Sequence, residues 1–563
     1  MNEPLNDLLD SRASGWGRLS SRTFIVVAVI VAALLRIAWA VRHGLAIDQD
    51  GAEYCRIAQN LLAGRGYVGI FDNGPQLNYG PLYPLMIAGV SVVLRSTESA
   101  ARAISIVFGA ALVVPMFKIA ERLYGRRVAG AVTALVVFHP ALIALAASTY
   151  AEGPYLTLLM WALLWLMKWV TDRRIGASIA AGALFGLAYL VRTEAFVLAG
   201  AFVAAGLVAA PFVRDRRATL IGALALAATF AVVAAPYVAF LTRSTGRFRI
   251  EGKGAIVYEW SQRINAGMTD QEAGRGIGAD LSDQGVYMKP NLEVVNSASY
   301  TPRDLLVFLL KNARRNIGVI HETIVDEAAL GSPILFALAV LGLFRAAWDR
   351  RRIALEGILV ATGGMVVLIL FSAPEFYFRF IYPLLGLLLI WAGKGADELR
   401  EWGRVTVASF SHNERLVRTG GACLKWASIG LVLVISLRAL PGLFQFQESL
   451  LGERARAGRW LAAQQGGRKW VMDTGVQVAY YAGGDMIYLP YATSDLALRY
   501  IAKRQPSFIV LHSGTNPLSL PYANQWFDSG IPDRRAVLVY DRGTPPQERI
   551  EIYRWVDGTH TAL

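Results

Sequence analysis

The chain has 563 residues, of which 55% are hydrophobic and only 17% are charged, and its mean hydropathy is +0.40. In soluble domains about a quarter of the residues are charged. The low share of charged residues here excludes a disordered chain and disfavours one large soluble domain. The net charge of +14 admits a nucleic acid, a membrane surface or an anionic substrate as partner, and two cysteines are too few for a disulfide scaffold or a cysteine zinc cluster.

Long apolar runs separated by short basic segments follow one another along the chain. Most approach the ~20 residues that cross a hydrocarbon core of about 30 Å. They predict an α-helical polytopic membrane protein with about eleven transmembrane helices. The candidate spans are residues 24–41, 101–120, 128–147, 154–170, 175–191, 195–213, 218–241, 332–347, 353–373, 376–393 and 423–443.

Lysine and arginine in the short loops predict the orientation, because cytoplasmic loops are enriched in both. The apolar run at 81–94 has about 14 residues, which is short for a span and typical of a re-entrant or interfacial helix. Counting it as a span would place Arg126 and Arg127 outside and would invert every later basic cluster. The sequence therefore predicts a dipping helix at 81–94, a cytoplasmic N-terminus and an outer C-terminus. Most of the net charge then faces the cytoplasm, so no nucleic-acid partner is expected.

The first span could instead be a signal peptide, since Ala38-Trp39-Ala40 resembles a small-residue cleavage site. Its apolar stretch is long, Arg36 interrupts it and Arg42 follows it. These features favour a retained helix over a cleaved peptide.

The predicted topology divides the chain into three parts. They are a cytoplasmic tail at 1–23, a transmembrane domain at 24–443 with outer loops 42–100 and 242–331, and an outer domain at 444–563. The outer domain is predicted to be a small α/β domain. Its expected strands include residues 470–472, 487–489, 508–511 and 536–540, with a helix at 492–503. Cys55 and Cys423 fall near opposite faces of the membrane and are not expected to pair.

The first outer loop is the most informative segment for chemistry. Apolar residues from Tyr54 to Leu62 recur at helical spacing, which predicts an amphipathic helix in the membrane interface. Asp48 and Asp50 lie at its N-terminus, where the helix dipole favours carboxylates. Capping explains this pair at least as well as catalysis does. The two aspartates could also hold a divalent cation through oxygen ligands, although no residue cluster in the chain has convincing metal-ligand spacing.

Other charged residues are expected at the same membrane face. Glu152 lies in a short outer turn beside Pro154, where it is either functional or the carboxylate of a helix start. Arg192 and Glu194 end one span and begin the next, and Arg379 lies just inside a later span. Each arginine could be an interfacial anchor. Together, these acids and cations predict a site for an anionic, membrane-tethered substrate.

Two histidines can be interpreted either as functional groups or as structural residues. His321, in the second large outer loop, could be a ligand or a base, although a lone histidine is more often structural. His139, followed by Pro140 within an apolar span, is expected to be a packed core residue. The chain has no phosphate-binding P-loop and no Gly-x-Ser-x-Gly nucleophile elbow.

Several motifs occur in a characteristic order along the chain. They read Asp50-x-x-x-Tyr54-x-x-x-Ala58-x-Asn60-Leu61, Gly64-x-Gly66-Tyr67, Tyr79-Gly80-Pro81-Leu82-Tyr83-Pro84-Leu85, Arg122-Leu123-Tyr124-Gly125-Arg126-Arg127 and Arg379-Phe380-Ile381-Tyr382-Pro383-Leu384. This order resembles the GT-C membrane glycosyltransferases. More narrowly, it resembles the branch that contains the protein O-mannosyltransferases, the lipid A aminoarabinose transferase and the bacterial lipopolysaccharide-core transferases. The likeness covers about residues 24–393 and is weak in the C-terminal tail.

The resemblance implies a GT-C-like fold in a bacterial inner membrane and an inverting hexosyl- or pentosyltransferase. The donor would be a polyprenyl-phosphate-linked monosaccharide among membrane lipids, and the acceptor a glycolipid, polysaccharide or protein outside the cytoplasm. By analogy, Asp50 is the general base, and Glu152 orients a substrate or stabilises oxocarbenium-like charge. Arg192 and Arg379 are the expected ligands of the leaving phosphate. The further substrate-binding candidates are Asp48, Tyr54, Arg56, Tyr79, Tyr83, Glu194, His321 and Tyr382.

Two departures from the family pattern narrow this expectation. The aminoarabinose transferases have a lysine before the outer-loop prolines, where this chain has Tyr79-Gly80-Pro81, which argues against lipid A modification. Gly51 follows Asp50 where many relatives have glutamate, so the paired acids of the protein mannosyltransferases are absent. The alternatives are a secondary transporter, a ligase or polymerase of lipid-linked oligosaccharides, and a non-catalytic membrane scaffold.

Overall fold

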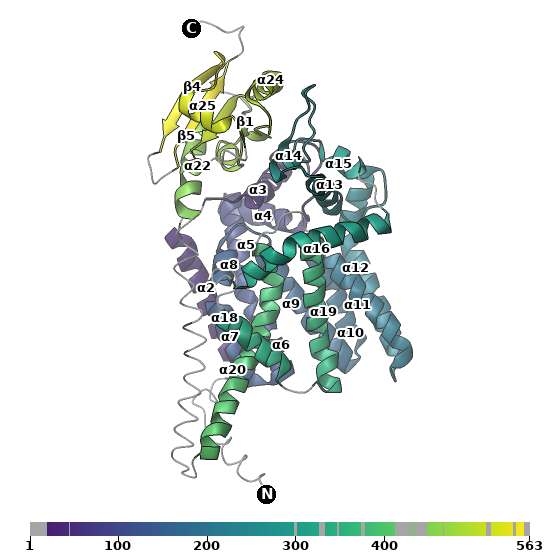
Figure 1. The fold of residues 1–563 in the computed structure, drawn as a ribbon. Helices are drawn as coiled ribbons and strands as arrows, with labels where there is room; N and C mark the ends of the chain where they lie inside the picture. Colours follow the sequence, from purple (N-terminus) through teal and green to yellow (C-terminus); the bar gives the residue numbers. More distant parts are fainter. Residues whose placement is uncertain are drawn as a thin grey trace.

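Most of the chain forms a bundle of helices, and a small sheet domain sits at one end of it (Figure 1). The structure is a computed structural model. It describes residues 20–43, 46–297, 301–325, 333–345, 348–372, 378–410, 430, 434, 447–465, 467–513, 520–543 and 548–556. The predicted combination of a helical membrane protein with a small C-terminal sheet domain is confirmed.

The bundle helices pack through apolar residues inside and also present apolar residues outside. Val26, Val232 and Leu368 are each more than half exposed, as expected of a surface that faces lipid. The bundle comprises α2 (Ser21–His43), α5 (Thr97–Ala111), α6 (Val113–Tyr124), α7 (Arg126–Phe138), α8 (Pro140–Ala147), α9 (Glu152–Asp172), α10 (Ile175–Val191), α11 (Ala195–Ala209), η2 (Ala210–Phe212), α12 (Arg216–Thr245), α18 (Pro333–Phe344), α19 (Arg350–Ser372), η3 (Phe378–Ile381) and α20 (Tyr382–Phe410).

Six helices of the described chain are long and apolar enough to cross a membrane, counting α5 with α6 and α11 with η2 as one each. The bent pair of α7 and α8 makes a seventh if it is one span. Two expected spans, α10 and α18, are apolar but shorter. The expected span at 376–393 corresponds to η3 and the start of α20, and the one at 423–443 lies outside the described residues. The count of about eleven spans stays a prediction.

The expected straight span at 128–147 is broken in its middle. The axes of α7 and α8 differ by 52°, and Pro140 is the first residue of α8. Proline lacks the amide hydrogen of a continuous helix, and it pushes the preceding residue into an extended conformation. His139 at the break has φ −66° and ψ 121° and is buried, as predicted.

The first outer loop forms two short helices, α3 (Gln49–Leu62) and α4 (Leu82–Leu94), and both were predicted. The second large outer loop contains α13 (Lys253–Asn265), α14 (Asp270–Arg275), α15 (Asn291–Ser297) and α16 (Pro302–Val325). The long helix α16 was not predicted, and Figure 1 shows it crossing the bundle near the outer ends of its helices. Buried Asn312 and Asn316 bond to carbonyls at the end of α19, whereas Leu306 and Leu310 are exposed.

The C-terminal domain is built around a five-stranded sheet with the order β2-β1-β3-β5-β4. β1 (Trp470–Asp473) pairs in parallel with β2 (Asp485–Tyr488) and with β3 (Phe508–His512). β5 (Ile550–Trp555) is antiparallel to β3 and to β4 (Ala536–Arg542). The helices of the domain are α22 (Gln447–Ala462), α23 (Gln477–Tyr481), α24 (Ser494–Arg504) and α25 (Ala523–Ser529). The four predicted strands and the predicted helix are confirmed, and β5 is an additional strand.

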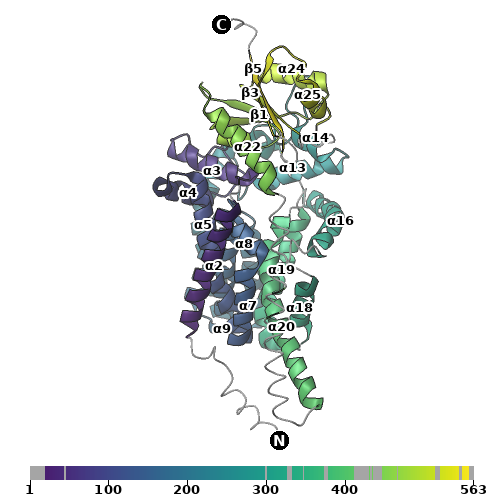
Figure 2. The same ribbon diagram turned by 90° about the vertical axis from the view of Figure 1, so that its left-hand side faces the viewer.

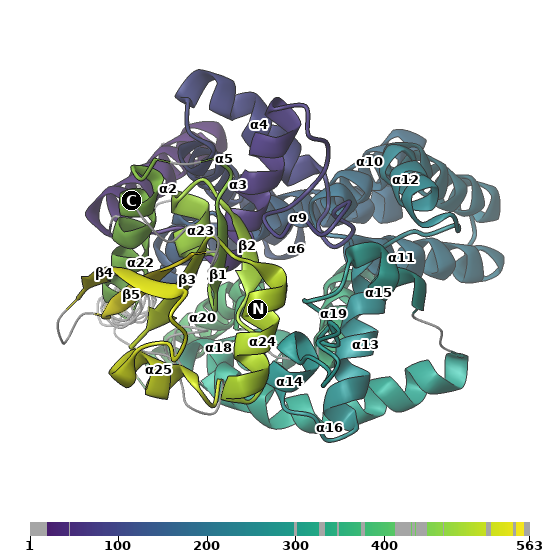
Figure 3. The ribbon, with the colours of Figure 1, turned by 90° about the horizontal axis from the view of Figure 1, so that it is seen from above.

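The sheet domain packs directly on the first outer loop, and the view from above in Figure 3 shows α23 and β2 close to α3. The amide of Met486 donates to the carbonyl of Ile70 at 2.9 Å, and the rings of Phe71 and Tyr488 stack with centroids 4.7 Å apart. Arg56 of α3 donates to the carbonyl of Gly484 at 2.7 Å. These contacts place β2 beside α3 and the loop that follows α3.

Thiol labelling tests the predicted orientation. In a variant with both native cysteines replaced by serine, exposed Asp280→Cys should react with a membrane-impermeant thiol reagent in intact cells, because its loop is predicted outside. Exposed Arg351→Cys, in an arginine cluster, should react only after permeabilisation. The reverse pattern of labelling would contradict the predicted topology.

Candidate active site

The site is built on the N-terminus of α3. Asp48 caps this helix, and its Oδ1 accepts a hydrogen bond from the amide of Gly51 at 2.7 Å. Its Oδ2 accepts a second bond, at 2.6 Å, from the hydroxyl of Thr149. The capping role considered for Asp48 is therefore present in the structure. The second bond also ties α3 to the turn that precedes α9.

Gly51 lies at the closest point of this contact. A Cβ atom at Gly51 would be 1.9 Å from Oγ1 of Thr149, so any side chain there would push the two segments apart. This crowding gives a physical reason for the glycine that follows Asp50, where many relatives have glutamate.

Asp50 lies in the first turn of α3, half-buried beside a cluster of tyrosines. The hydroxyl of Tyr79 donates to Oδ1 of Asp50 at 3.1 Å. The ring of Tyr54 meets those of Tyr79 and Tyr83 edge-on, with centroids 4.9 and 5.0 Å apart. A Cβ atom at Gly80 would lie 2.4 Å from the carbonyl oxygen of Leu190, so the segment that carries Tyr79 packs against the end of α10.

A second chain of hydrogen bonds connects the first outer loop to the turn before α9. The hydroxyl of Tyr83 and that of Ser105 are 3.1 Å apart, and Ser105 donates to the carbonyl of Tyr150 at 3.1 Å. Because Tyr150 and Thr149 are neighbours, two independent contacts hold this turn. Glu152 follows it as the first residue of α9.

Glu152 belongs to a four-membered ionic cluster. Arg192 donates to Glu152 at 2.5 Å and to Glu194 at 3.1 Å, and Lys253 of α13 donates to Glu194 at 2.8 Å. Burial opposes charge on both Arg192 and Glu194, but their partners outweigh it. The pKa of Arg192 is raised by Glu194 and Glu152, and the pKa of Glu194 is lowered by Arg192 and Lys253.

The aromatic ring of Phe380 in η3 connects this cluster to the segment that leads into α20. The Arg192 guanidinium carbon lies 5.4 Å from the ring centroid, and Nζ of Lys253 lies 5.8 Å from it. Arg379 is the preceding residue of η3, and its side chain lies outside the described part of the structure, as does that of His321 in α16. Lys253 was not predicted, because nothing in the local sequence distinguishes it from other outer-loop cations.

Comparisons with known proteins support the same fold. A family model described as dolichyl-phosphate-mannose-protein mannosyltransferase matches residues 78–240, which include Tyr79, Glu152, Arg192 and Glu194. A search of curated proteins by sequence gives no match.

Two solved structures resemble most of the chain. The archaeal oligosaccharyltransferase AglB from Archaeoglobus fulgidus, in complex with an inhibitory peptide and a dolichol-phosphate, has a TM-score of 0.55 at 13% identity over 87% of this chain and 69% of its own. ArnT from Cupriavidus metallidurans, bound to undecaprenyl phosphate, has a TM-score of 0.54 at 13% identity. The match covers 95% of this chain and 98% of ArnT. The chain has the GT-C glycosyltransferase fold.

A third GT-C structure, the arabinofuranosyltransferase AftD from Mycobacteria, has a TM-score of 0.50 at 14% identity. The match covers 96% of this chain but only 42% of AftD. At these identities the shared property is the GT-C fold, which confirms the resemblance read from the sequence motifs. The multi-pass membrane character follows from the same fold.

Four of the candidate substrate-binding residues are buried within the GT-C domain. Tyr54, Arg56, Tyr83 and Tyr382 are each at most 4% exposed. Arg56 bonds to backbone carbonyls of the C-terminal domain, and Tyr83 bonds to Ser105. This burial gives these residues packing and positioning contacts, whereas Asp50 and Tyr79 are partly exposed.

Glu53 is a buried acid on α3 that the sequence did not reveal. Its two oxygens accept hydrogen bonds from the amide of Ile70 and from Nε2 of Gln76, both at 2.6 Å. Burial outweighs these bonds and raises the pKa of Glu53 to about 7. Glu53 thus holds the following loop against α3, one helical turn from Asp50.

The raised pKa of Glu53 predicts how stability depends on pH. Between its unfolded value of about 4.3 and its folded value of about 7, the folded state binds more protons, so the free energy of unfolding falls as pH rises. The Tm of the wild type should therefore fall from about pH 5 to about pH 8 relative to that of Glu53→Gln.

The control for this measurement is Glu259→Gln, which removes a partly exposed carboxylate paired with Arg263. Its Tm should follow the wild-type pH profile. Parallel profiles for Glu53→Gln and the wild type would contradict the role assigned to Glu53.

Proposed function

We propose that the chain is an inverting glycosyltransferase that moves one monosaccharide from a polyprenyl-phosphate-linked donor to an acceptor hydroxyl on the outer membrane face. The observation that carries the proposal is the bond between Asp48 and Thr149. It brings the α3 turn that contains Asp50 next to the α9 start that contains Glu152. Two carboxylates from distant segments would thereby contribute to one site.

Asp50 would act as the general base of this reaction. The acceptor oxygen attacks the anomeric carbon while its proton moves to Asp50, and the bond between that carbon and the phosphate oxygen breaks with its electron pair on the phosphate. Attack from the face opposite the phosphate inverts the configuration. Tyr79 donates to one oxygen of Asp50, which orients the carboxylate for this step.

The ionic cluster would handle the charges that develop on the donor. The Arg192 contact fixes Glu152, which would face the oxocarbenium-like charge of the sugar. Arg192 and Lys253 flank Phe380 and would meet the growing negative charge of the phosphate together with Arg379. The lipid phosphates in the AglB and ArnT structures support a donor of this class.

The acceptor would approach Asp50 below the C-terminal domain. Gln49, the residue before Asp50, donates to the hydroxyl of Tyr488 at 3.1 Å. Tyr488 ends β2, and the guanidinium of Arg275 lies over its ring at 4.4 Å. We propose these residues as the wall that meets the acceptor, be it glycolipid, polysaccharide or protein.

Transfer of a preassembled oligosaccharide is the second candidate, because AglB is an oligosaccharyltransferase. Labelled polyprenyl-phospho-monosaccharides and polyprenyl-linked oligosaccharides, supplied in parallel to membranes that contain the chain, separate the two. We expect label transfer from a monosaccharide donor. Transfer from oligosaccharide donors alone would favour the second candidate.

A divalent cation at Asp48 and Asp50 is a separate proposal. Each oxygen of Asp48 already accepts one hydrogen bond, which leaves a second lone pair on each oxygen for a cation. Transfer in the presence of a chelator decides the question, since full activity there would exclude a required cation.

Two neighbouring aspartates provide a matched test of the general base. Asp50→Asn should lower the transfer rate by about 10²–10⁴-fold, because an amide cannot take the acceptor proton. Asp48→Asn should retain most activity, because its amide oxygen still accepts from the Gly51 amide and its amide nitrogen can donate to the Thr149 hydroxyl, which keeps the contact with the bond reversed. The readout is transfer of label from the monosaccharide donor, with membrane insertion measured for each variant.

Glu152→Gln provides the second half of this test. The variant should lose at least about tenfold in transfer rate, because it removes both the carboxylate and its pairing with Arg192. If Asp50→Asn and Glu152→Gln both stay fully active while correctly inserted, the proposed site is wrong.

A further inference from the structure

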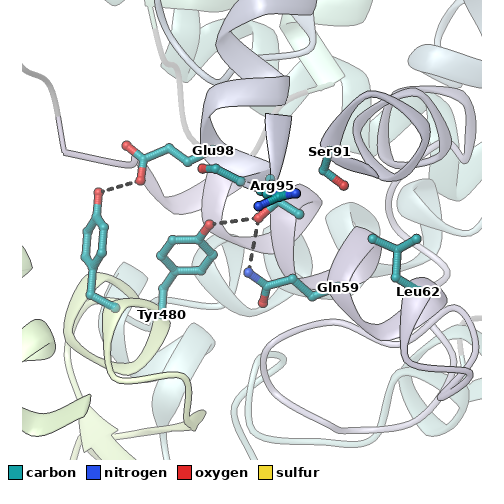
Figure 4. Close-up of a pocket in the computed structure, with 9 residues that line it drawn as sticks. Gln59, Leu62, Ser91, Arg95, Glu98 and Tyr480 are labelled. Carbon is teal, nitrogen blue, oxygen red and sulfur yellow. Dashed lines mark hydrogen bonds between the residues drawn. The ribbon is translucent and has the colours of Figure 1, made fainter. Parts of the chain in front are cut away.

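A pocket of about 430 Å³ opens at the far end of α3 from the proposed active site. Gln59 lines it and lies about 14 Å along the helix from Asp50. Its volume falls in the range of small-molecule sites, ~300–1,000 Å³. The residues that line it, shown in Figure 4, are Gln59, Leu62, Ser91, Arg95, Ser96, Thr97, Glu98, Tyr480 and Tyr481.

The wall formed with the C-terminal domain is polar, and its polar side chains hydrogen-bond to one another. The hydroxyl of Thr97 accepts from Gln59 at 3.1 Å and lies 3.2 Å from that of Tyr480. Tyr481 donates to Glu98 at 3.1 Å, and Arg102 pairs with the other oxygen of Glu98 at 2.5 Å. The carboxylate in the pocket is therefore already compensated by a cation.

Arg95 is the charge that remains available in this pocket. It directly follows α4 and is exposed. Among the residues that the structure describes, no carboxylate lies within ion-pair distance of its guanidinium. An anion in the pocket would therefore gain a charge-assisted contact without breaking an existing pair.

The surface of α4 that leads to Arg95 is apolar and exposed, and so is Leu62, which lines the pocket. Val92, Val93 and Leu94, which immediately precede Arg95, are 67%, 80% and 44% exposed, and Leu62 is 54% exposed. Figure 2 shows α4 on the outside of the bundle, at the height where the bundle meets the C-terminal domain. An exposed apolar run that ends in a cation at this height is typical of the membrane interface.

We propose that this pocket binds the phosphodiester headgroup of a membrane lipid, with Arg95 on the phosphate and the acyl chains along Val92, Val93 and Leu94. The exposed apolar surface of α4 is the reason to assign a lipid and not a free phosphate, because a free phosphate has no apolar part that could cover it. Tyr480 and Tyr481 close the pocket from the C-terminal domain. A bound lipid would therefore also brace that domain against α3 and α4. The inference is independent of the proposed transferase activity, because neither Asp50 nor Glu152 lines the pocket.

Thermal unfolding of the purified full chain in a non-ionic detergent tests the proposal. Phosphatidylglycerol should raise the Tm by about 2 °C or more, because it binds the folded state. Diacylglycerol with the same chains lacks the phosphate, glycerophosphoglycerol lacks the chains, and inorganic phosphate lacks both the chains and the glycerol. None of these three should raise the Tm at the same concentration.

The variant Arg95→Gln should bind phosphatidylglycerol at least about tenfold more weakly, as judged from the lipid dependence of its Tm. Arg65→Gln is the matched control, since Arg65 is exposed on the same outer loop but does not line the pocket. It should respond to the lipid as the wild type does. An unchanged lipid response in Arg95→Gln, an equal loss in Arg65→Gln, or an equal Tm rise with inorganic phosphate would each overturn the proposal.

Discussion

The arrangement of the site depends on the contact between Thr149 and the start of α3. Thr149 donates to Asp48, and the same threonine occupies the space next to Gly51 where a side chain would otherwise be. The contact joins a loop helix to the turn before a bundle helix. Asp50 and Glu152 lie within three residues of its two ends, so the contact, together with the bonds of Ser105 to Tyr83 and Tyr150, holds the two carboxylate-bearing segments together. Each carboxylate alone is an ordinary helix-start acid.

The second constraint is the charge balance around Arg192. Two carboxylates and two cations form one partly buried cluster, in which removal of Glu152 or Arg192, the two least exposed members, leaves an uncompensated charge at a poorly solvated place. A lipid phosphate that enters beside Phe380 would add negative charge on the side where Lys253 and Arg192 already lie. The cluster therefore has a structural role, to which the proposed function adds phosphate binding by its two cations.

The sequence predicted those features that are local. Apolar runs gave the bundle helices, helical spacing gave α3 and α4, and buried strand patterns gave four strands of the sheet. The helix α16 was missed because its buried face carries Asn312 and Asn316 beside Phe308 while most of its other apolar residues are exposed, which departs from the usual pattern. Lys253, Glu53 and the contact of Thr149 with Asp48 were missed because they depend on distant segments meeting, which no local pattern encodes.

The most direct test of this account is the activity of two variants at Thr149. This residue takes no part in the proposed chemical steps. Thr149→Val keeps the shape but removes the hydroxyl that donates to a partly buried oxygen of Asp48, which lowers the free energy of unfolding by about 1 kcal/mol. The account predicts that Thr149→Val inserts normally but loses at least about tenfold in kcat, and that Thr149→Ser, which keeps the donor, retains activity. A fully active Thr149→Val would contradict the claim that this contact assembles the site.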